Sequence, residues 1–360
     1  MFPTGCFLLL LTLVFAPRIF SEEVSLPHNL DKLVPQLMAK HHVPGVGIVG
    51  IEKQRIAWER YYGVRSAGKS QRVDSKTIFE AASLSKLPAA CAALKLVEQG
   101  KLNLDRPLSD YLGRPYLTNA PLHLKITARM VLSHTTGFPN WREGGWRSDG
   151  PLPVLREPGS QFGYSGEGFL YLQRVMEHLT GETLEPYLQR TLLKPAGMKS
   201  SSYVWQKEFE RSAAAGHNAK GELPKKRELY RDANAAYSLY CTPREYALFL
   251  LEILKTDRSA KHSLSASSLK AMLTRTTKIE DRKPLIRRGK QLSEPVYYGL
   301  GWVINVTESG ERFYHTGSNG TGFRCYCEFD LVRGSGIVIM TNAAGGAELW
   351  RELIAAVADP

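Results

Sequence analysis

The chain has 360 residues, of which 43% are hydrophobic and 23% are charged, a composition that is ordinary for a globular protein with a sizeable core. Its formal net charge is +12. The basic residues concentrate in two clusters, 225–231 and 282–290, which lie in or next to segments punctuated by glycine or proline and contain few aromatic residues. We interpret both as solvated loops and expect no nucleic-acid partner.

The amino-terminal region contains an uncharged run, residues 7–16, that is too short to span a bilayer. Its length is typical of the core of a secretory signal. We expect a signal peptide over residues 1–21, with cleavage after Ser21, and a single mature domain over residues 22–360. No other segment reaches the length of a membrane span, so the sequence predicts a secreted or periplasmic protein without a stable membrane anchor after cleavage.

Periodicity and capping signals predict a series of helices and strands along the mature chain. The expected helices cover residues 29–42, 83–99, 127–134, 166–179, 184–193, 243–254, 266–273 and 347–357. The expected strands cover residues 45–52, 55–62, 298–306, 312–315, 322–330 and 336–341.

This order of early strands, a helical middle and late strands favours an α+β fold. We expect one antiparallel sheet built from both ends of the chain and flanked by helices. The mostly helical region between about residues 102 and 254 is then an insertion into that sheet.

The mature chain keeps four cysteines. Two of them, Cys325 and Cys327, are two residues apart on an expected strand, so they face the same way and are poorly placed to bridge each other. This Cys-x-Cys pattern also lacks the paired spacing of a zinc site. We expect buried or partly buried free thiols at Cys91, Cys241, Cys325 and Cys327.

A Ser-x-x-Lys pattern occurs three times, beginning at Ser66, Ser83 and Ser267. The copy at Ser66 lies in a polar, glycine-bearing stretch that is typical of a loop, and the copy at Ser267 opens a short helix. Only Ser83 follows an apolar strand and leads a long apolar helix. There the serine and Lys86 share one helix face, and the free N–H groups of the first turn point toward the hydroxyl. That arrangement suits a serine that is acylated without a histidine.

Other hydrolytic chemistries lack their signatures in this sequence. No His-x-His-x-Asp pattern indicates a metallo-hydrolase, and no Gly-x-Ser-x-Gly elbow indicates an α/β-hydrolase. His134 lies at the end of an expected helix, where we interpret it as a packing and hydrogen-bonding residue that shapes the loop. We therefore expect neither a metal nor a cofactor.

Five short motifs, in this order and spacing, resemble those of the serine β-lactamases and penicillin-binding proteins. They are residues 79–86, Leu-Ser-His-Thr-Thr-Gly at 132–137, Tyr-Ser-Gly at 164–166, Tyr-Gly-Leu-Gly-Trp at 298–302 and His-Thr-Gly at 315–317. The likeness is specifically to the class C β-lactamase-like branch, which includes D-alanyl-D-alanine carboxypeptidases, D-aminopeptidases and esterases. It runs from about residue 30 to residue 356.

The resemblance implies that Ser83 is the nucleophile of an acyl-enzyme mechanism. A serine hydroxyl needs a base within hydrogen-bond reach, and Lys86 can serve if its pKa falls well below the free value of about 10.4. The resemblance assigns Tyr164 to proton transfer between the serine and the leaving group. Whether Lys86 or Tyr164 is the acylation base stays open at this point.

The resemblance also implies a substrate-binding strand edge and an oxyanion hole. The backbone N–H groups of Ser83 and Ser318 are the expected oxyanion donors, and losing one such donor typically costs about 3–4 kcal/mol. His315, Thr316 and Gly317 are expected to lie beside the substrate, with Thr316 holding a carboxylate or carbonyl. Asn140 and Trp141 are further candidates to line the pocket.

Two positions depart from the pattern of the β-lactamases in this branch. Gly166 stands where they usually carry an asparagine that binds the substrate amide, and His315 stands where they usually carry a lysine. Both departures remove contacts specific to β-lactams and leave the nucleophile, base and oxyanion hole in place. The sequence therefore predicts inefficient β-lactamase activity.

Together these features predict a secreted serine hydrolase that cleaves an amide or ester through an acyl-enzyme on Ser83. The expected partner is a small-molecule or peptide substrate: a peptide of D-amino acids, as in cell walls, a carboxylic ester or, weakly, a β-lactam. The alternatives are a penicillin-binding module that turns over slowly and an idle relative that only binds cell-wall peptides.

Overall fold

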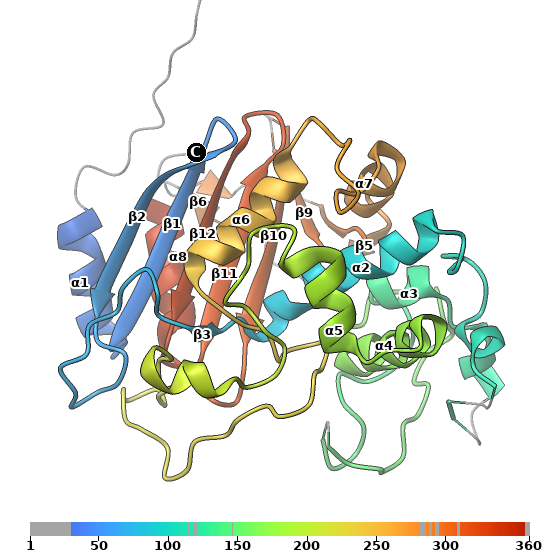
Figure 1. Cartoon of the computed structure of the whole chain (residues 1–360), viewed down its shortest axis with the longest axis horizontal. Helices are drawn as coiled ribbons and strands as arrows, with labels where there is room; N and C mark the ends of the chain where they lie inside the picture. Colours follow the sequence, from blue (N-terminus) through green and yellow to red (C-terminus); the bar gives the residue numbers. More distant parts are fainter. Residues whose placement is uncertain are drawn as a thin grey trace, which may run out of the picture.

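A computed structural model describes residues 30–356, apart from residues 114–115, 118–120, 146, 281–285, 288–289, 292–294 and 308–309 (Figure 1). The expected signal peptide and most of the basic stretch 282–290 lie outside the described residues. None of the described helices is long and apolar enough to cross a membrane.

The centre of the fold is an eight-stranded antiparallel sheet with the order β2-β1-β12-β11-β10-β9-β8-β5 (Figure 1). Its strands are β1 (Gly45–Glu52), β2 (Arg55–Gly63), β5 (Thr277–Ile279), β8 (Val296–Tyr298), β9 (Val303–Thr307), β10 (Gly310–Ser318), β11 (Arg324–Asp330) and β12 (Ser335–Thr341). Since β1 pairs with β12, the two ends of the chain share one sheet. This confirms the expected α+β fold.

Helices cover both faces of this sheet (Figure 1). One face packs on α1 (Leu30–Lys40) and α8 (Gly346–Ala356), and the other packs on the helical region that contains α2 (Lys86–Glu98) and α6 (Pro243–Leu254). The other elements are α3 (Ala128–Leu132), α4 (Gly166–Thr180), α5 (Leu184–Leu188), α7 (Ala266–Leu273) and the two-stranded pairs β3 (Phe79–Glu80) with β4 (Tyr240–Cys241) and β6 (Ile286–Arg287) with β7 (Lys290–Gln291).

Most element types agree with the sequence predictions, and three segments differ. The helix expected over residues 83–99 begins as a 3₁₀ turn, η1 (Ala82–Ser85), before α2. The strand expected over residues 298–306 is two strands, because the chain turns at Gly301 with a φ of +104° that favours glycine. The helix expected over residues 184–193 passes from α5 into a π turn (Gln189–Leu193).

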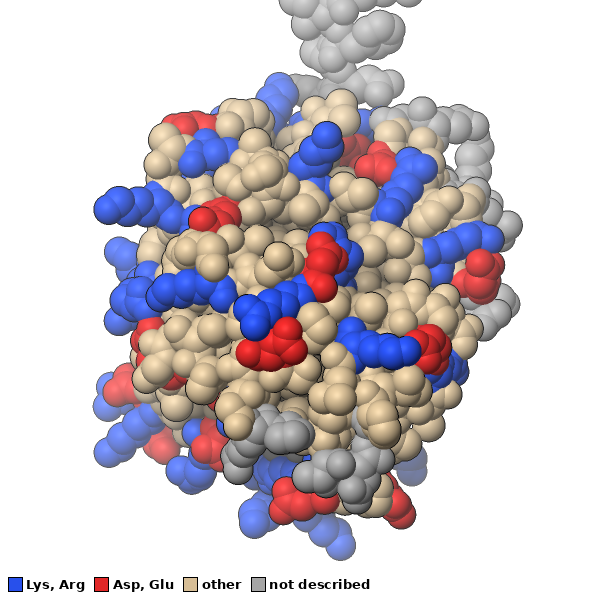
Figure 2. Space-filling model, turned by 90° about the vertical axis from the view of Figure 1, so that its right-hand side faces the viewer, with Lys and Arg blue, Asp and Glu red and all other residues tan. Residues whose placement is uncertain are grey.

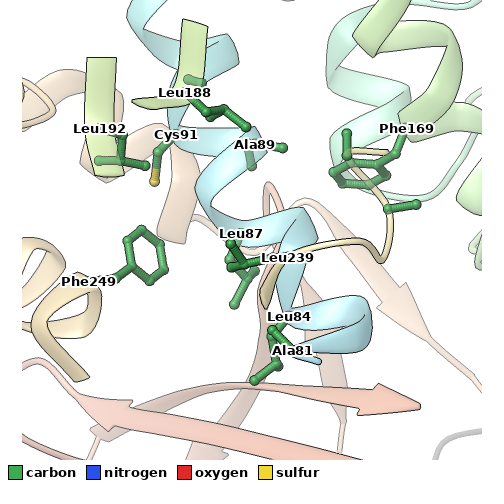
Figure 3. Close-up of a cluster of buried hydrophobic side chains, with 14 of the residues drawn as sticks. Ala81, Leu84, Leu87, Ala89, Cys91, Phe169, Leu188, Leu192, Leu239 and Phe249 are labelled. Carbon is green, nitrogen blue, oxygen red and sulfur yellow. The ribbon is translucent and has the colours of Figure 1, made fainter. Parts of the chain in front are cut away.

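Helix α2 forms the middle of the helical region. Its residues from Lys86 to Leu94 are all buried, and their side chains reach neighbours in several directions (Figure 3). A helix that is apolar around its whole circumference is stable only when it is covered on all sides. Packing therefore fixes the position of the turn that precedes α2, which carries Ser83.

Four cysteines, Cys91, Cys241, Cys325 and Cys327, are buried and free in the structure, as the sequence predicts. On the face that Figure 2 shows, Lys and Arg side chains are dispersed, and several lie next to acidic side chains.

Candidate active site

The turn that carries Ser83 is strained and tightly held. Ala82 has a φ of +50°, a left-handed conformation that costs a residue with a Cβ about 1–2 kcal/mol. The buried Ser85 side chain secures the turn, because its hydroxyl donates to the Ala82 carbonyl at 2.6 Å and accepts from the Leu239 N–H at 2.9 Å. Strain at a single non-glycine residue next to a reactive side chain is typical of functional turns.

Lys86 lies one turn after Ser83 and is almost completely buried, with 1% of its surface exposed. Its Nζ lies 3.3 Å from Ser83 Oγ and donates to the Ala236 carbonyl at 2.7 Å. Burial disfavours the ammonium form and lowers the pKa of Lys86 to about 7. Near neutral pH, a substantial fraction of the amine is therefore neutral and able to accept the Ser83 proton.

Tyr164 packs against the same amine. Lys86 Nζ lies 4.9 Å from the centroid of the Tyr164 ring. The centroids of the Tyr164 and His134 rings are 4.2 Å apart. The buried His134 accepts the Ser165 N–H through Nδ1 at 3.1 Å, which agrees with its predicted packing and hydrogen-bonding role. Ser165 caps α4 by accepting the Gly168 N–H, so it serves the helix rather than the cavity.

Strand β10 passes close to this turn at Gly317. A Cβ at Gly317 would lie 2.5 Å from the Ala81 carbonyl oxygen and 3.2 Å from the Ala82 Cβ, so this approach requires glycine. The ladder between β10 and β9 runs from Gly310 to Tyr314, and residues 315–318 extend beyond it. The end of β10 thereby reaches the cavity at Ser318.

A cavity of about 160 Å³ collects most of the predicted site residues. Ser83, Lys86 and Tyr164 line it together with the predicted Ser318, Asn140 and Trp141. Its other lining residues are Glu228, Tyr230, Tyr237, Asn319, Gly320 and Thr321. The backbone N–H groups of Ser83 and Ser318 thus belong to two elements that meet at one small cavity.

Four predicted binding residues do not line this cavity: His315, Thr316, Gly317 and Gly166. His315 is 3% exposed and does not line the cavity. Its Nε2 lies 3.1 Å from the Tyr298 hydroxyl, and its Nδ1 lies 2.8 Å from the Thr316 carbonyl oxygen. Its ring lies 6.3 Å from that of Tyr164 on centroids. Direct substrate contact by these four residues stays a prediction.

One buried carboxylate beside the site was missed by sequence reasoning. Glu80, three residues before Ser83, accepts the Thr321 hydroxyl at 2.6 Å and the Asn319 side-chain amide at 3.1 Å. Burial raises the pKa of Glu80 to about 7, although both hydrogen bonds act in the opposite direction. The signal was present in the sequence, since Glu80 is a charged residue within the apolar run that precedes Ser83.

Tyr230 and Tyr237 were also missed, and no motif in the sequence marks them. Their rings meet at 5.0 Å on centroids in an edge-to-face arrangement, and both line the cavity. Among the residues that the structure describes, no group of three or more His, Cys, Asp or Glu side chains is arranged to hold a metal ion.

The other two Ser-x-x-Lys copies occupy ordinary structural positions. Ser66 lies in a turn, where its carbonyl accepts the Lys69 N–H at 3.2 Å. Ser267 lies in the first turn of α7, whose N-cap is Ser265. Neither lines the cavity at Ser83.

Comparisons with known proteins identify the family and the fold of this chain. A family model described as Beta-lactamase matches residues 30–359. The chain is 22% identical over 334 residues to Protein flp of Staphylococcus aureus (strain N315), covering 87% of this chain and 62% of that protein, so it spans less than two thirds of that relative's length.

Two solved structures share the fold. A class C beta-lactamase superposes with a TM-score of 0.74 at 21% identity, over 92% of this chain and 96% of that chain. The D-alanine carboxypeptidase AmpC from Burkholderia cenocepacia superposes with a TM-score of 0.71 at 19% identity, over 89% and 96% of the two chains. Both likenesses agree with the α+β architecture predicted from the sequence.

Proposed function

Because this chain belongs to the beta-lactamase family, we propose that it is a serine hydrolase that cleaves an amide or ester through an acyl-enzyme on Ser83. The observation that carries the proposal is the pair formed by Ser83 Oγ and the buried amine of Lys86, which lie 3.3 Å apart at the edge of a small cavity. A nucleophile and base within hydrogen-bond reach are the minimum equipment for such a reaction.

In the acylation step, Ser83 Oγ bonds to the substrate carbonyl carbon while its proton moves to the site base. Lys86 is the base nearest to the hydroxyl, and burial keeps part of its population neutral near pH 7. The bond to the leaving group then breaks, and Tyr164, packed against Lys86, passes the proton to the departing atom. Water completes the cycle by hydrolysing the Ser83 ester, which releases the acid and restores the hydroxyl.

The N–H groups of Ser83 and Ser318 stabilise the negative charge that develops on the carbonyl oxygen. The close approach of Gly317 to Ala81 and Ala82 supports this pairing, because Ser318 and Ser83 directly follow the residues in contact. Glu80 supports this arrangement because its carboxylate accepts hydrogen bonds from Asn319 and Thr321, in the loop directly after Ser318. Donors that are fixed before the substrate arrives need no rearrangement during the reaction.

The proposed substrates are small amides or esters, including short peptides of D-amino acids derived from cell walls. The proposed location is outside the cytoplasm, in the periplasm or the medium, because the chain begins with an expected signal peptide. The second candidate function is a penicillin-binding module that is acylated and turns over slowly. The observation that favours it is Gly166, where β-lactamases of the class C branch usually carry an asparagine.

The test is turnover of a chromogenic short-chain ester and of a D-alanyl dipeptide by wild type, Ser83→Ala and Ser267→Ala. The third protein is a matched control, because Ser267 belongs to another Ser-x-x-Lys copy outside the cavity. We expect Ser83→Ala to abolish turnover and Ser267→Ala to retain it. Turnover that survives in Ser83→Ala contradicts the proposed function. Acylation by a penicillin with little release favours the second candidate.

A further inference from the structure

Position 166 is a glycine at the first residue of α4, where the backbone does not demand one. Gly166 has no positive φ, and Ser165 caps the helix in the ordinary way. The reason for glycine is instead the side chain that stands beside it. A Cβ at Gly166 would lie 2.4, 2.5 and 2.8 Å from three ring atoms of Trp141. The Trp141 indole therefore fills the space that a side chain at position 166 would take.

The indole is held there by the backbone around it. The Asn140 carbonyl accepts the N–H groups of Gly166 and Glu167 at 3.0 and 3.1 Å. On the other side of Trp141, the Arg142 guanidinium donates twice to the fully buried Glu167 carboxylate, at 3.0 and 2.9 Å. Because both neighbours of Trp141 are tied to the start of α4, the indole has little freedom to swing away.

The indole also contacts an aromatic side chain of the cavity, that of Tyr237. Trp141 packs edge to face on Tyr237 at 5.7 Å between ring centroids. Both side chains line the cavity that contains Ser83, whose volume of about 160 Å³ is below the roughly 300–1,000 Å³ of pockets for drug-sized ligands. This side of the cavity is thus small and is formed by two aromatic side chains in contact.

We propose that Trp141 replaces the missing side chain at position 166 as the wall of the acyl subsite, and that it restricts the enzyme to short acyl groups. This inference rests on the proposed function. The acyl group is the part that bonds to Ser83 Oγ while the leaving group departs with the proton. A bulky acyl group that bears an amide, such as that of a penicillin, finds the indole where it needs space.

The first experiment tests the contact between position 166 and the indole by thermal unfolding, without relying on activity. Gly166→Ala should lower Tm when Trp141 is present, because the new Cβ meets the ring. In a Trp141→Ala background the same change should raise Tm, since alanine is favoured over glycine in a helix. Equal effects of Gly166→Ala in both backgrounds would overturn the steric assignment.

The second experiment measures kcat/KM for p-nitrophenyl esters from acetate to octanoate. Wild type should prefer acetate and butyrate, and Trp141→Ala should raise the octanoate-to-acetate ratio by about tenfold or more. Trp141→Leu provides a second variant that keeps an apolar side chain if the alanine variant unfolds. An unchanged ratio in a folded variant would overturn the proposal.

Trp58→Ala is the matched control. Trp58 also covers a glycine, Gly50, whose Cβ would lie 2.1 Å from its ring, but it belongs to β2 at the far edge of the sheet. We expect it to leave the ester profile unchanged. If no ester is turned over by any protein while the Tm pattern holds, the proposed function and the acyl restriction both fail, and the contact between Trp141 and position 166 stands.

Discussion

Two regions bury ionisable side chains against the same sheet and treat them differently. Beneath α8, Arg312 and Glu328 are both fully buried and form an ion pair at 3.1 Å. The Tyr326 hydroxyl donates to the other oxygen of that carboxylate at 2.7 Å. At the active site, Lys86 and Glu80 are equally buried, and neither has an ion-pair partner among the residues that the structure describes.

The difference shows what each arrangement is suited for. A buried charge that has a close counter-charge stays ionised and contributes to a single packed structure. A buried group without a close counter-charge has its pKa shifted in the direction that favours its neutral form. Burial accordingly raises the pKa of Glu80 and lowers the pKa of Lys86, in both cases to about 7. The candidate site thus holds two buried groups whose pKa values lie near 7.

The largest expected effect follows from removing the amine. Lys86→Met should lower kcat/KM by about 10²–10⁴-fold, the usual contribution of a positioned proton-transfer group. Its Tm at pH 7 should be unchanged or higher, because an apolar side chain replaces an unpaired buried amine. Ester turnover measures the change in kcat/KM, and thermal unfolding measures the change in Tm. Retained activity would contradict the role of Lys86 in proton transfer, and a large fall in Tm would contradict the contrast with the buried Arg312–Glu328 pair.

The reverse pattern is expected beneath α8. Arg312→Met leaves the Glu328 carboxylate buried without its cation and should lower the free energy of unfolding by about 3–5 kcal/mol. Arg351→Met removes an exposed ion pair to Glu348 and serves as the control, with an expected change below about 1 kcal/mol. Chemical denaturation at pH 7 measures both. Similar losses in the two variants would contradict a special role for the buried pair.

The pH dependence of kcat/KM of the wild-type protein should follow the titration of Lys86. The active form of Lys86 is neutral, and its pKa is about 7, so the neutral fraction falls about tenfold for each pH unit below 7. We expect kcat/KM at pH 5 to be about 100-fold below its plateau above pH 8. A flat profile between pH 5 and 8 would show that Lys86 does not act as the base.

The smallest effect concerns Glu80 and stability. Its pKa in the folded state, about 7, lies above the ordinary value of 4.5, so its contribution is fully present below pH 4.5 and is lost as pH rises through 7. Lys86 contributes a slope of opposite sign above pH 7, so a comparison between proteins is needed. Relative to wild type, Glu80→Gln should gain about 1–3 kcal/mol of unfolding free energy between pH 4.5 and 8. Parallel profiles would contradict the shift.

The sequence predicted the architecture well where local patterns and packing agree. The bounds of β1 and the N-cap at Thr242 both match the structure, although β1 is buried on both faces and its burial does not alternate. The split between β8 and β9 escaped, since a run of apolar residues does not reveal a turn at Gly301. Long-range contacts decide such breaks.

The site shows the same boundary. Ser83 and Lys86 could be proposed from their spacing at the start of a long apolar helix, and Tyr164 from the resemblance to a family. Tyr237 could not be found, because it reaches the cavity only through the tertiary fold. The meaning of Gly166 was half visible: the sequence showed the missing side chain, and only the structure showed that Trp141 takes its place.

The most direct test of the central claim is intact mass of the full chain, followed over time with a penicillin and with a short-chain ester. With the ester, the account predicts a transient adduct of the acyl mass on wild type, located at Ser83 by peptide mapping and absent from Ser83→Ala. With the penicillin it predicts little or no adduct, because the Trp141 indole takes the space that the bulky acyl group needs. An adduct at another residue, or one that persists in Ser83→Ala, would contradict it.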